Sequence, residues 1–390
     1  MEILTRAINS VQKSKLAFSK FITANDVGDT GSHQYGFHIH KGAWNLLFDK
    51  PGEKGSNKDR FVTINWQNEF ETDSRFIYYG VKTRNEYRIT RFGKGFPFLG
   101  PDNVGDLLIL SKIEEDYYEA FVLSSDEEIE NFFEAFNISS NETNAIIPKQ
   151  GVFTDLFGLE NCFIDYIRNL NVDFPNTFEL ADAARNCYVN TFGLNGDKIK
   201  NNPDRIVINW LEAEYDLFKL IENDRYSHLI KKPFSSVEEL VIIANSILNR
   251  RKSRAGKSLE HHLEKIFKVS NLEFETQVIT ENNEKPDFIF PGGDAYQNIN
   301  FNTSKLKMLA CKTTCKDRWR QVLNEADRIP VKHLFTLQQG ISENQLDQMK
   351  KYGVKLVVPK EYKKSFPVKH RPDLLTLSDF INEIRGVQSV

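Results

Sequence analysis

The sequence contains few cysteines and no long apolar run. Its four cysteines are Cys162, Cys187, Cys311 and Cys315; they form no C-x-x-C pair and have no histidines at zinc-site spacing. We therefore expect reduced thiols in the core or near a site, as is usual in the cytoplasm. No apolar run approaches the length of a membrane span, and the N-terminus lacks the apolar segment of a secretory signal. These absences predict a cytoplasmic protein with no membrane partner.

The sequence also lacks an excess of positive charge, with 51 lysines and arginines against 54 acidic residues and a formal net charge of -3. DNA-binding proteins are often basic, so this balance counts mildly against DNA binding. The cations are nevertheless concentrated in residues 75–94 and 250–257. Such a local basic surface can attract phosphates, although either cluster can also be no more than a solvated face.

The length and patterning of the chain predict two domains, because 390 residues exceed the size of one usual domain. Residues 1–140 contain short alternating apolar runs, such as 61–66 and 76–79, and we predict a β-rich domain there. A polar stretch without periodicity indicates a linker at residues 141–160. Residues 161–390 alternate between helical and strand patterns, which predicts an α/β domain around a central sheet.

Individual elements of the second domain can also be located from its pattern. Apolar runs predict strands at 288–290, 306–311, 333–338 and 354–358, and apolar spacing predicts helices around 259–267 and at 317–329. Ser342 begins a capping box for one more helix. We expect residues 193–203 to form a surface loop.

Residues suited to phosphodiester hydrolysis stand at the ends of two predicted strands. Asp287 opens one strand and Lys312 ends the next, so both side chains would meet at one edge of the sheet, as in the PD-(D/E)xK nuclease motif. That motif has an acid where this sequence has Ala310, and we expect Glu325, on the predicted helix 317–329, to replace it. Glu260 is a fourth candidate, on the preceding helix. Carboxylates bind Mg²⁺ through hard oxygen atoms, and a lysine can orient water or neutralise charge, so this set predicts Mg²⁺-dependent nuclease chemistry.

The same residues allow other interpretations. A proline-aspartate pair followed by a lysine is common by chance, and here it can be a turn with a capping aspartate and a surface lysine. Ala310 favours a non-catalytic, sequence-specific DNA-binding regulator that keeps a decayed nuclease fold. A structure-selective nuclease, such as a junction resolvase, is a third hypothesis.

A charged triplet, Lys316, Asp317 and Arg318, follows soon after Lys312. Lysine and arginine suit the O6 and N7 atoms of guanine, and aspartate can accept a hydrogen bond from N4 of cytosine. The triplet is therefore complementary to consecutive G·C pairs, and its position would couple reading to cutting. Equally, it can be a helix start in which Asp317 is the cap and the two cations are solvated.

Longer stretches of the chain resemble the EcoRII-like restriction endonucleases, over nearly the whole sequence. In the second half these stretches are NRRKSRAGKSLE (249–260), KPDFIFP (285–291), CKTTCKDRWRQ (311–321), LNEAD (323–327) and HLFTLQ (333–338). The resemblance implies a C-terminal restriction-endonuclease fold that cleaves double-stranded DNA at a short CC(N/W)GG-type palindrome. It further implies a Mg²⁺ requirement and a homodimer, whose symmetry would match that of the palindrome.

The resemblance also assigns residues in this half. Its active-site set is Glu260, Asp287, Lys312 and Glu325, of which Asp287 and Glu325 are the expected metal ligands. Tyr296, which we group with the catalytic residues, falls on a position that the family uses at or near the DNA. Lys316 and Arg318 fall on such positions too, in agreement with the chemistry of the triplet.

The N-terminal half resembles the effector domain of the same family, a DNA-binding pseudobarrel. The similar stretches are ANDVGDTGSHQ (24–34) and KTRNEYRITRFG (82–93). The resemblance implies that this domain binds a second copy of the target and relieves autoinhibition of the cutting domain. Its implied DNA contacts are His33, Lys82, Arg84, Glu86 and Arg88. Their charges agree with that role, since cations suit guanine and phosphate and Glu86 suits cytosine, whereas an ordinary charged hairpin is the alternative.

The sequence departs from the family pattern at a few positions. Tyr87 stands where the family can have a lysine contact, and His38 stands where it can have a tyrosine. In the second half, the family holds flipped central bases with an arginine four residues before an aromatic. Tyr215 matches that aromatic and is an expected DNA contact, but Leu211 occupies the arginine position. Trp210 can either stack on a base instead or lie in the core.

Overall fold

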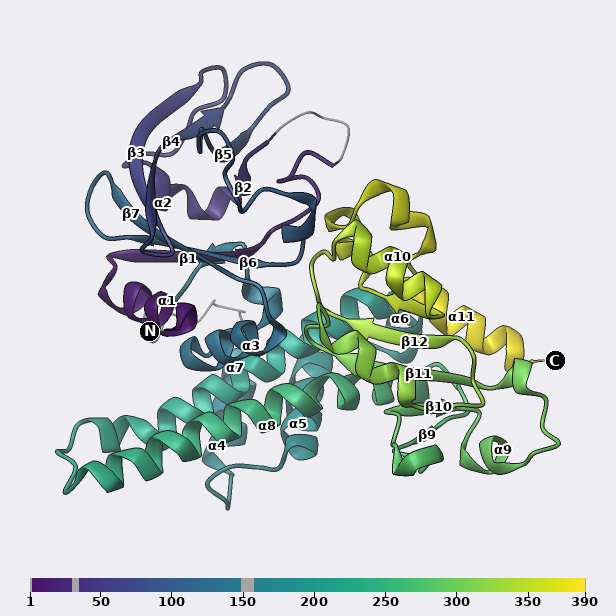
Figure 1. Ribbon diagram of the computed structural model, residues 1–390. Helices are drawn as coiled ribbons and strands as arrows, with labels where there is room; N and C mark the ends of the chain where they lie inside the picture. Colours follow the sequence, from purple (N-terminus) through teal and green to yellow (C-terminus); the bar gives the residue numbers. More distant parts are fainter. Residues whose placement is uncertain (1, 30–34, 149–157, 390) are drawn as a thin grey trace.

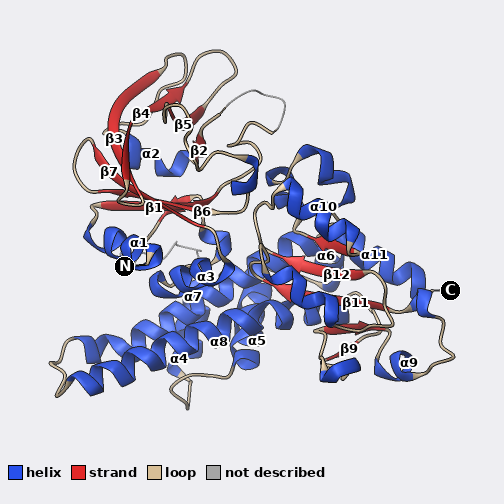
Figure 2. Ribbon diagram, in the orientation of Figure 1, coloured by secondary structure: helices blue, strands red, loops and turns tan. Residues whose placement is uncertain are grey.

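The protein combines a β-rich N-terminal part with a helical and α/β C-terminal part, in a computed structural model that describes residues 2–29, 35–148 and 158–389 (Figures 1 and 2). This mixed architecture confirms the predicted fold class. Among the described residues, no helix is both long enough and apolar enough to cross a membrane.

The N-terminal part is one curled sheet of eight strands, in the order β2-β5-β4-β3-β7-β6-β1-β8. The strands are β1 (Leu16–Phe21), β2 (Phe37–Ile39), β3 (Lys58–Trp66), β4 (Phe70–Tyr79), β5 (Glu86–Thr90), β6 (Leu107–Lys112), β7 (Tyr117–Leu123) and β8 (Ala145–Ile146). Neighbouring strands are antiparallel except β3 and β7, which are parallel. Burial alternates along much of β3, as a sheet with one face on a core requires. The predicted strands at 61–66 and 76–79 are thus confirmed.

Three helices accompany this sheet: α1 (Ile3–Lys13), α2 (Trp44–Leu47) and α3 (Asp126–Phe136). Helices α1 and α3 pack on one face of the sheet through a cluster that includes Val11, Phe121 and Phe132. The opposite face encloses a second core, in which Trp66 packs edge-to-face against Phe96. Strand β8 pairs with β1 inside the range that the sequence suggested as a linker, and the division into domains remains a prediction.

The middle of the chain is helical. It contains α4 (Leu159–Arg168), α5 (Thr177–Phe192), α6 (Gly196–Asn201), α7 (Pro203–Ile230) and α8 (Val237–Val269). The expected loop at 193–203 is therefore wrong, because Asn195 caps helix α6 within it. The expectation of four reduced thiols is wrong for two of them: Cys162 on α4 and Cys187 on α5 form a disulfide. Helix packing brings the two together across 25 residues of chain.

The C-terminal part is a five-stranded sheet in the order β13-β12-β11-β10-β9. Its strands are β9 (Glu275–Thr276), β10 (Phe288–Phe290), β11 (Lys307–Lys312), β12 (Lys332–Thr336) and β13 (Val354–Val357). Strands β11, β12 and β13 are parallel, whereas β10 runs antiparallel to β11. All four predicted strands are present: β10 has the predicted ends, and the ends of the other three differ by at most two residues.

Helices and apolar cores cover both faces of this sheet. The helices are α9 (Gly293–Gln297), α10 (Glu343–Lys351) and α11 (Leu377–Gln388). Helix α10 begins at the predicted cap, where the Ser342 hydroxyl accepts a hydrogen bond from the Gln345 amide. One core joins α7, α8 and α11 to the sheet, and the other includes Trp319, Leu346 and Met349. The predicted helix 317–329 is wrong: only the short 3-10 helix η6 (Arg318–Asn324) forms there.

Candidate active site and its cover

The register of β10 and β11 determines the position of the first two candidate residues. Phe288 pairs with Leu309 in antiparallel register, so Asp287 at the start of β10 lies beside the end of β11. There the Asp287 Oδ2 atom accepts a hydrogen bond from the Cys311 amide at 2.8 Å. Lys312 is the last residue of β11. The acid and the amine therefore share one edge of the sheet.

Glu325 reaches the same edge from an irregular segment rather than from a helix. It follows the end of η6 in an extended conformation, and Ala326 after it has a φ of 50°. The Lys332 ammonium holds this turn by donating to the Glu325 carbonyl and, at 2.6 Å, to the Ala326 carbonyl. Nothing in the sequence pattern indicated this role for Lys332, because it depends on how the chain turns. The substitute acid is thus positioned by a buried lysine and not by helical periodicity.

The Glu325 carboxylate is buried next to another acid. Its Oε2 atom has no hydrogen-bond partner among the described residues. Burial, followed by the nearby negative charge of Asp287, raises the pKa of Glu325 to about 7, although Lys312 opposes this rise. Burial also raises the pKa of Asp287, where the Cys311 amide and Lys312 act in the opposite direction. A positive charge between the two carboxylates would therefore stabilise the ionised form of both.

Glu260 completes the cluster from helix α8. Its carboxylate forms an ion pair with Lys257, one turn earlier, at 2.8 Å. Burial and then the charge of Asp287 raise the pKa of Glu260, while Lys257 and Lys312 oppose the rise. The Cys311 thiol lies among these groups, and burial followed by Asp287 and Glu260 raises its pKa. The structure thus brings Glu260, Asp287, Lys312 and Glu325 together.

This donor set fits a hard divalent cation. Three carboxylates with raised pKa values converge, and one buried carboxylate oxygen is without a partner in the described structure. Oxygen donors of this kind are those that Mg²⁺ takes in proteins. Ala310 lies in the core with 0% exposure, so its position contributes no ligand and Glu325 supplies the carboxylate instead.

Tyr296 belongs to a different group of side chains. Its hydroxyl donates a hydrogen bond to the Glu281 carboxylate, and the Arg328 guanidinium donates to its carbonyl. Burial and then the hydrogen bond to Glu281 raise the pKa of Tyr296. The structure does not bring Tyr296 into contact with the acidic cluster in the described part of the chain.

The charged triplet after Lys312 is held by an acid of the N-terminal part. The backbone amides of Lys316, Asp317 and Arg318 donate to the Asp126 carboxylate at 3.0, 2.9 and 3.0 Å. Asp126, at the start of α3, has 0% exposure. A hydrogen bond with Asp126 raises the pKa of Asp317 to about 6. Successive amides around one carboxylate form the type of nest that also holds phosphate groups.

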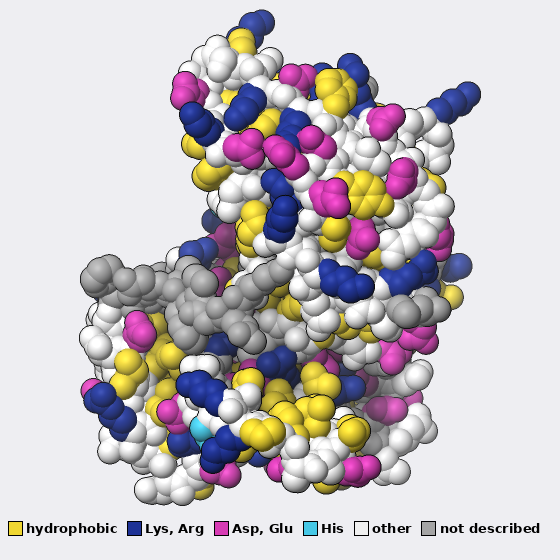
Figure 3. Space-filling view, turned by 90° about the vertical axis from the view of Figure 1, so that its left-hand side faces the viewer, with side chains coloured by type: hydrophobic (Ala, Val, Ile, Leu, Met, Phe, Trp, Pro, Cys, Tyr) yellow, Lys and Arg dark blue, Asp and Glu magenta, His cyan; other side chains and the backbone are white. Residues whose placement is uncertain are grey.

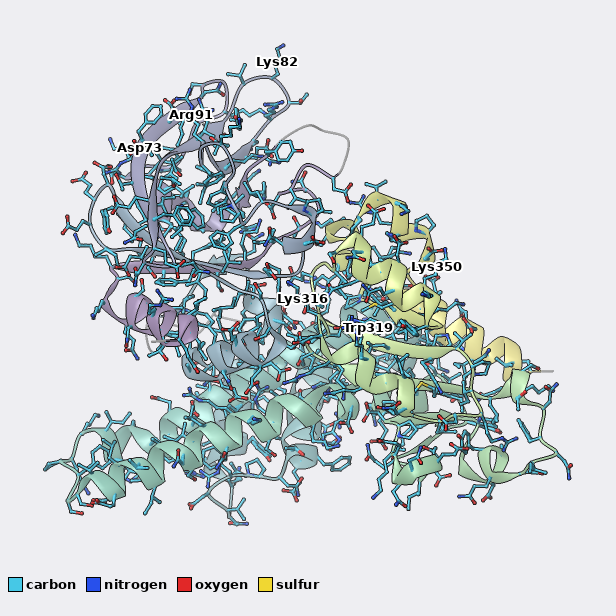
Figure 4. All side chains as sticks on the ribbon, viewed as in Figure 1. Asp73, Lys82, Arg91, Lys316, Trp319 and Lys350 are labelled. Carbon is cyan, nitrogen blue, oxygen red and sulfur yellow. A yellow bond between two sulfur atoms is a disulfide. The ribbon has the colours of Figure 1, made fainter. Side chains whose placement is uncertain are left out.

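The side chains of the triplet are engaged by acids as well. The Lys316 ammonium forms an ion pair with Asp106, which is 1% exposed, at the junction of the two parts (Figure 4). Arg318 forms an ion pair with Glu130 of α3 at 2.6 Å. Glu130 also accepts hydrogen bonds from the hydroxyls of Thr313 and Thr314 at 3.3 and 3.0 Å. The whole segment 313–318 is therefore bound by carboxylates of the N-terminal part.

A cavity of about 280 Å³ separates α3 from the acidic cluster. Its lining comes from both parts of the chain and includes Glu130, Tyr215, Arg254, Glu260, Asp287 and Lys312. The Tyr215 hydroxyl donates to the Ile138 carbonyl at 2.7 Å, and the Arg254 guanidinium lies 3.7 Å from the Tyr215 ring centroid. Arg254 belongs to the basic cluster 250–257, but the sequence did not indicate its position against Tyr215. Trp210 lies in the core with 0% exposure, so it is not available to stack on a base.

The predicted DNA contacts of the N-terminal part fall into two groups. Lys82 and Arg84 are exposed in the turn between β4 and β5, and Figure 4 shows Lys82 at the outer end of this hairpin, far from the nuclease sheet. Glu86 is half-buried, and Arg88 is 3% exposed and donates to the Gly36 carbonyl at 3.2 Å. His33 lies outside the described residues.

Tyr87 and His38, the two residues of this half that depart from the family pattern, are also largely buried. Tyr87 is 4% exposed, and its hydroxyl accepts a hydrogen bond from the Gly52 amide at 2.7 Å. The His38 ring is largely buried, and this burial lowers its pKa to about 4, with the Lys20 charge acting in the same direction. Lys20 itself forms a buried ion pair with Asp26 at 2.6 Å, a contact that the sequence did not indicate.

Two family models and several known proteins are similar to this chain. Residues 11–149 match the family model for the N-terminal part of restriction endonuclease EcoRII, and residues 218–381 match the model for the EcoRII C terminus. The chain is 38% identical to the type II restriction enzyme EcoRII of Escherichia coli, over 95% of this chain and 94% of that protein. It is 24% identical to the type II restriction enzyme SsoII of Shigella sonnei, over 48% and 70% of the two chains. A solved complex of Ecl18kI with uncleaved, modified DNA matches 59% of this chain and 84% of its own, with 19% identity and a TM-score of 0.46.

Proposed function

Because this chain belongs to the EcoRII family of restriction endonucleases, we propose that its sheet-edge cluster cleaves both strands of a DNA target in a Mg²⁺-dependent reaction. The resemblance inferred from the sequence is confirmed, and with it the assignment to DNA-cleaving enzymes. The observation that supports the site is the convergence of Asp287, Glu325 and Glu260 on Lys312, with a buried carboxylate oxygen unpaired in the described structure.

Each residue of the cluster has a distinct task in this proposal. Asp287 and Glu325 hold the cation, and Glu260 adds negative charge to their field. Bound Mg²⁺ supplies activation of the attacking water and neutralisation of charge at the scissile phosphate. Lys312, at the same edge, donates to a phosphate oxygen or orients the water, and as a fixed cation it stabilises the charge that develops there. The hydrogen bond from the Cys311 amide keeps Asp287 in position.

We further propose that the N-terminal part holds the enzyme in an inhibited arrangement. Asp126 and Glu130 accept hydrogen bonds from the amides, hydroxyls and guanidinium group of this segment. These are the donors that would otherwise bind the phosphates and base edges of DNA. Binding of a second target copy to the N-terminal part, at Lys82 and Arg84, would move α3 and free this segment. Lys316, Asp317 and Arg318 would then read the G·C pairs of the target.

The target we propose is a CC(N/W)GG-type palindrome, read by a homodimer in the cytoplasm. An exposed apolar surface supports association: hydrophobic side chains gather at the turn between α7 and α8 (Figure 3). These side chains are Ile230, Val237, Leu240, Val241 and Ile242, with exposures from 44% to 71%. Large exposed apolar patches are rare on monomeric proteins and often mark contact surfaces.

Cleavage of a plasmid that contains the target tests the catalytic proposal. Asp287→Ala should abolish cutting in Mg²⁺ while leaving DNA binding in a gel-shift assay largely intact. Asp294→Ala, which removes an exposed acid on nearby α9, is the matched control and should cut normally. Cutting by Asp287→Ala at the wild-type rate would overturn the assignment. Failure of the wild type to cut under any metal condition, with added target duplex, would instead support the non-catalytic regulator.

A further inference from the structure

A second group of metal-ligating side chains lies outside the nuclease cluster, on α10 and the 3-10 helix η8 (Val368–Asp373). Glu343 and Asp347 stand four residues apart on α10, so both face the same side of that helix. His370 approaches them from η8. One donor atom from each of the three residues lies within 4.8 Å of the others.

The imidazole of His370 distinguishes this group from an ordinary acidic patch. His370 is 3% exposed, and its Nε2 atom is buried with no hydrogen-bond partner in the part of the chain that the structure describes. That atom lies 3.5 Å from Asp347 Oδ1, so it points toward the carboxylates. Buried polar atoms are rarely left unpaired, and a metal ion bound to the nitrogen would satisfy it.

Lys369 occupies part of the same space. Its ammonium forms ion pairs with Glu343 and, at 3.4 Å, with Asp347. The Lys369 side chain is 61% exposed, so it can leave the carboxylates without breaking a packed core. An ammonium between two carboxylates is a competitor that a divalent ion must displace.

We propose that Glu343, Asp347 and His370 bind one divalent transition-metal ion of the zinc class. A nitrogen donor with two carboxylates suits ions such as Zn²⁺, Co²⁺ or Ni²⁺, because imidazole is a poor partner for Mg²⁺. The three residues supply three ligands, and water would complete the coordination. This ion is therefore chemically distinct from the Mg²⁺ of the nuclease cluster, and the proposal is independent of it.

The position of the site suggests what the ion does. Asp29, in the N-terminal part, lies within electrostatic range of Glu343 and His370. Close by, the Ala24 amide donates across the junction to the Ser365 carbonyl at 3.0 Å. Glu343 repels Asp29, whereas Arg371, His370 and Lys369 attract it, and a dication on α10 would add to this attraction. The bound ion should thus hold the N-terminal part more firmly against the nuclease part.

Calorimetric titration of the full-length chain with Zn²⁺ tests the site. The Asp287→Ala variant in excess Mg²⁺ should be the background, so that the nuclease cluster does not contribute. We expect one strong equivalent, which Asp347→Asn should weaken at least about tenfold. Lys369→Ala should tighten binding by about threefold to fivefold, since it removes a competing exposed ion pair.

Asp373→Asn is the matched control, because Asp373 lies on the same 3-10 helix and pairs with Lys350 but offers no ligand to the site. Its Zn²⁺ affinity should be unchanged. His370→Gln removes the nitrogen ligand and should also weaken Zn²⁺ binding. If this variant fails to fold, Asp347→Asn and Lys369→Ala still decide the question, because the side chains of Asp347 and Lys369 are exposed. Equal Zn²⁺ affinity in the background protein, Asp347→Asn and Lys369→Ala would overturn the proposal.

Hydrogen exchange gives a second readout, of the junction itself. Zn²⁺ should slow exchange of the Ala24 amide in the parent chain and leave it unaltered in Asp347→Asn. Unchanged exchange at Ala24 in both proteins, although Zn²⁺ is bound, would overturn the inferred effect on the junction while leaving the metal site in place.

Discussion

Removing the charge of Glu130 should activate the enzyme in the absence of a second target copy. The Glu130 carboxylate pairs with Arg318 at 2.6 Å and accepts hydrogen bonds from Thr313 and Thr314. Glu130→Gln keeps one carbonyl oxygen for the hydroxyls but loses the ion pair. Arg318 would then be free to bind DNA, and helix α3 would bind the segment 313–318 less strongly.

The size of this effect follows from the exposure of the pair. The Arg318 and Glu130 side chains are 31% and 20% exposed, so solvent screens part of their attraction. A partly buried charged hydrogen bond of this kind contributes about 1–2 kcal/mol. About 1.4 kcal/mol corresponds to a factor of ten in an equilibrium constant. The fraction of molecules in which α3 has released the nuclease segment should therefore rise about fivefold to thirtyfold.

The assay is the initial cleavage rate of a short duplex with one target site, at a concentration too low to fill the N-terminal part. Glu130→Gln should cut faster than the wild type by that factor, and saturating second-site duplex should remove the difference. Glu127→Gln is the control, since it makes the same charge change at an exposed position of α3. Equal rates for Glu130→Gln, Glu127→Gln and the wild type would refute the inhibitory role of α3.

Three further predictions concern other features of the chain. Without divalent cations, the unfolding free energy should fall as the pH rises from about 5 to 8, since the raised pKa of Glu325, about 7, lets the folded protein keep a proton that the unfolded chain has released. Urea titrations should show a smaller pH slope for Glu325→Gln, and an equal slope would contradict this. Cys162→Ser should lower the unfolding free energy by about 3 kcal/mol and make it insensitive to dithiothreitol, as expected for a disulfide that closes a 25-residue separation. Arg84→Ala, but not Lys94→Ala, should weaken second-target binding about tenfold in a filter assay with uncleavable DNA.

The two contacts that we propose to be inhibitory should differ in their sensitivity to salt. Exposed and half-exposed ion pairs weaken when salt screens them, whereas buried ones change little. Arg318 with Glu130 belongs to the first kind, and the Asp126 carboxylate among three backbone amides belongs to the second. The second contact should therefore keep α3 in place when the first has weakened.

Local pattern predicted the elements that build the nuclease sheet. The runs at 288–290 and 306–311 became β10 and β11, and Ser342 caps α10 as expected. Once those two strands pair, Asp287 and Lys312 have to meet at one edge. The strands and the meeting of Asp287 and Lys312 depend on side-chain alternation and on where each strand ends, and both can be recognised in the sequence.

Predictions that relied on periodicity alone failed where other parts of the chain act on a segment. Residues 317–329 have helical spacing, yet the Asp126 carboxylate binds the amides at their start and Lys332 fixes the turn at their end, so only a short 3-10 helix forms. Cys162 and Cys187 show no disulfide signature, and the packing of α4 on α5 brings them together.

By itself, the sequence determined the family, the mixed fold and the residue types of the candidate site, because these follow from motifs and from short-range alternation. The tertiary structure alone decided which side chains cover that site. The acids that bind the segment 313–318 come from positions 106, 126 and 130, more than 180 residues away for the hydrogen bonds to Asp126 and Glu130. Contacts over such separations depend on how two folded parts dock, and no local pattern encodes that.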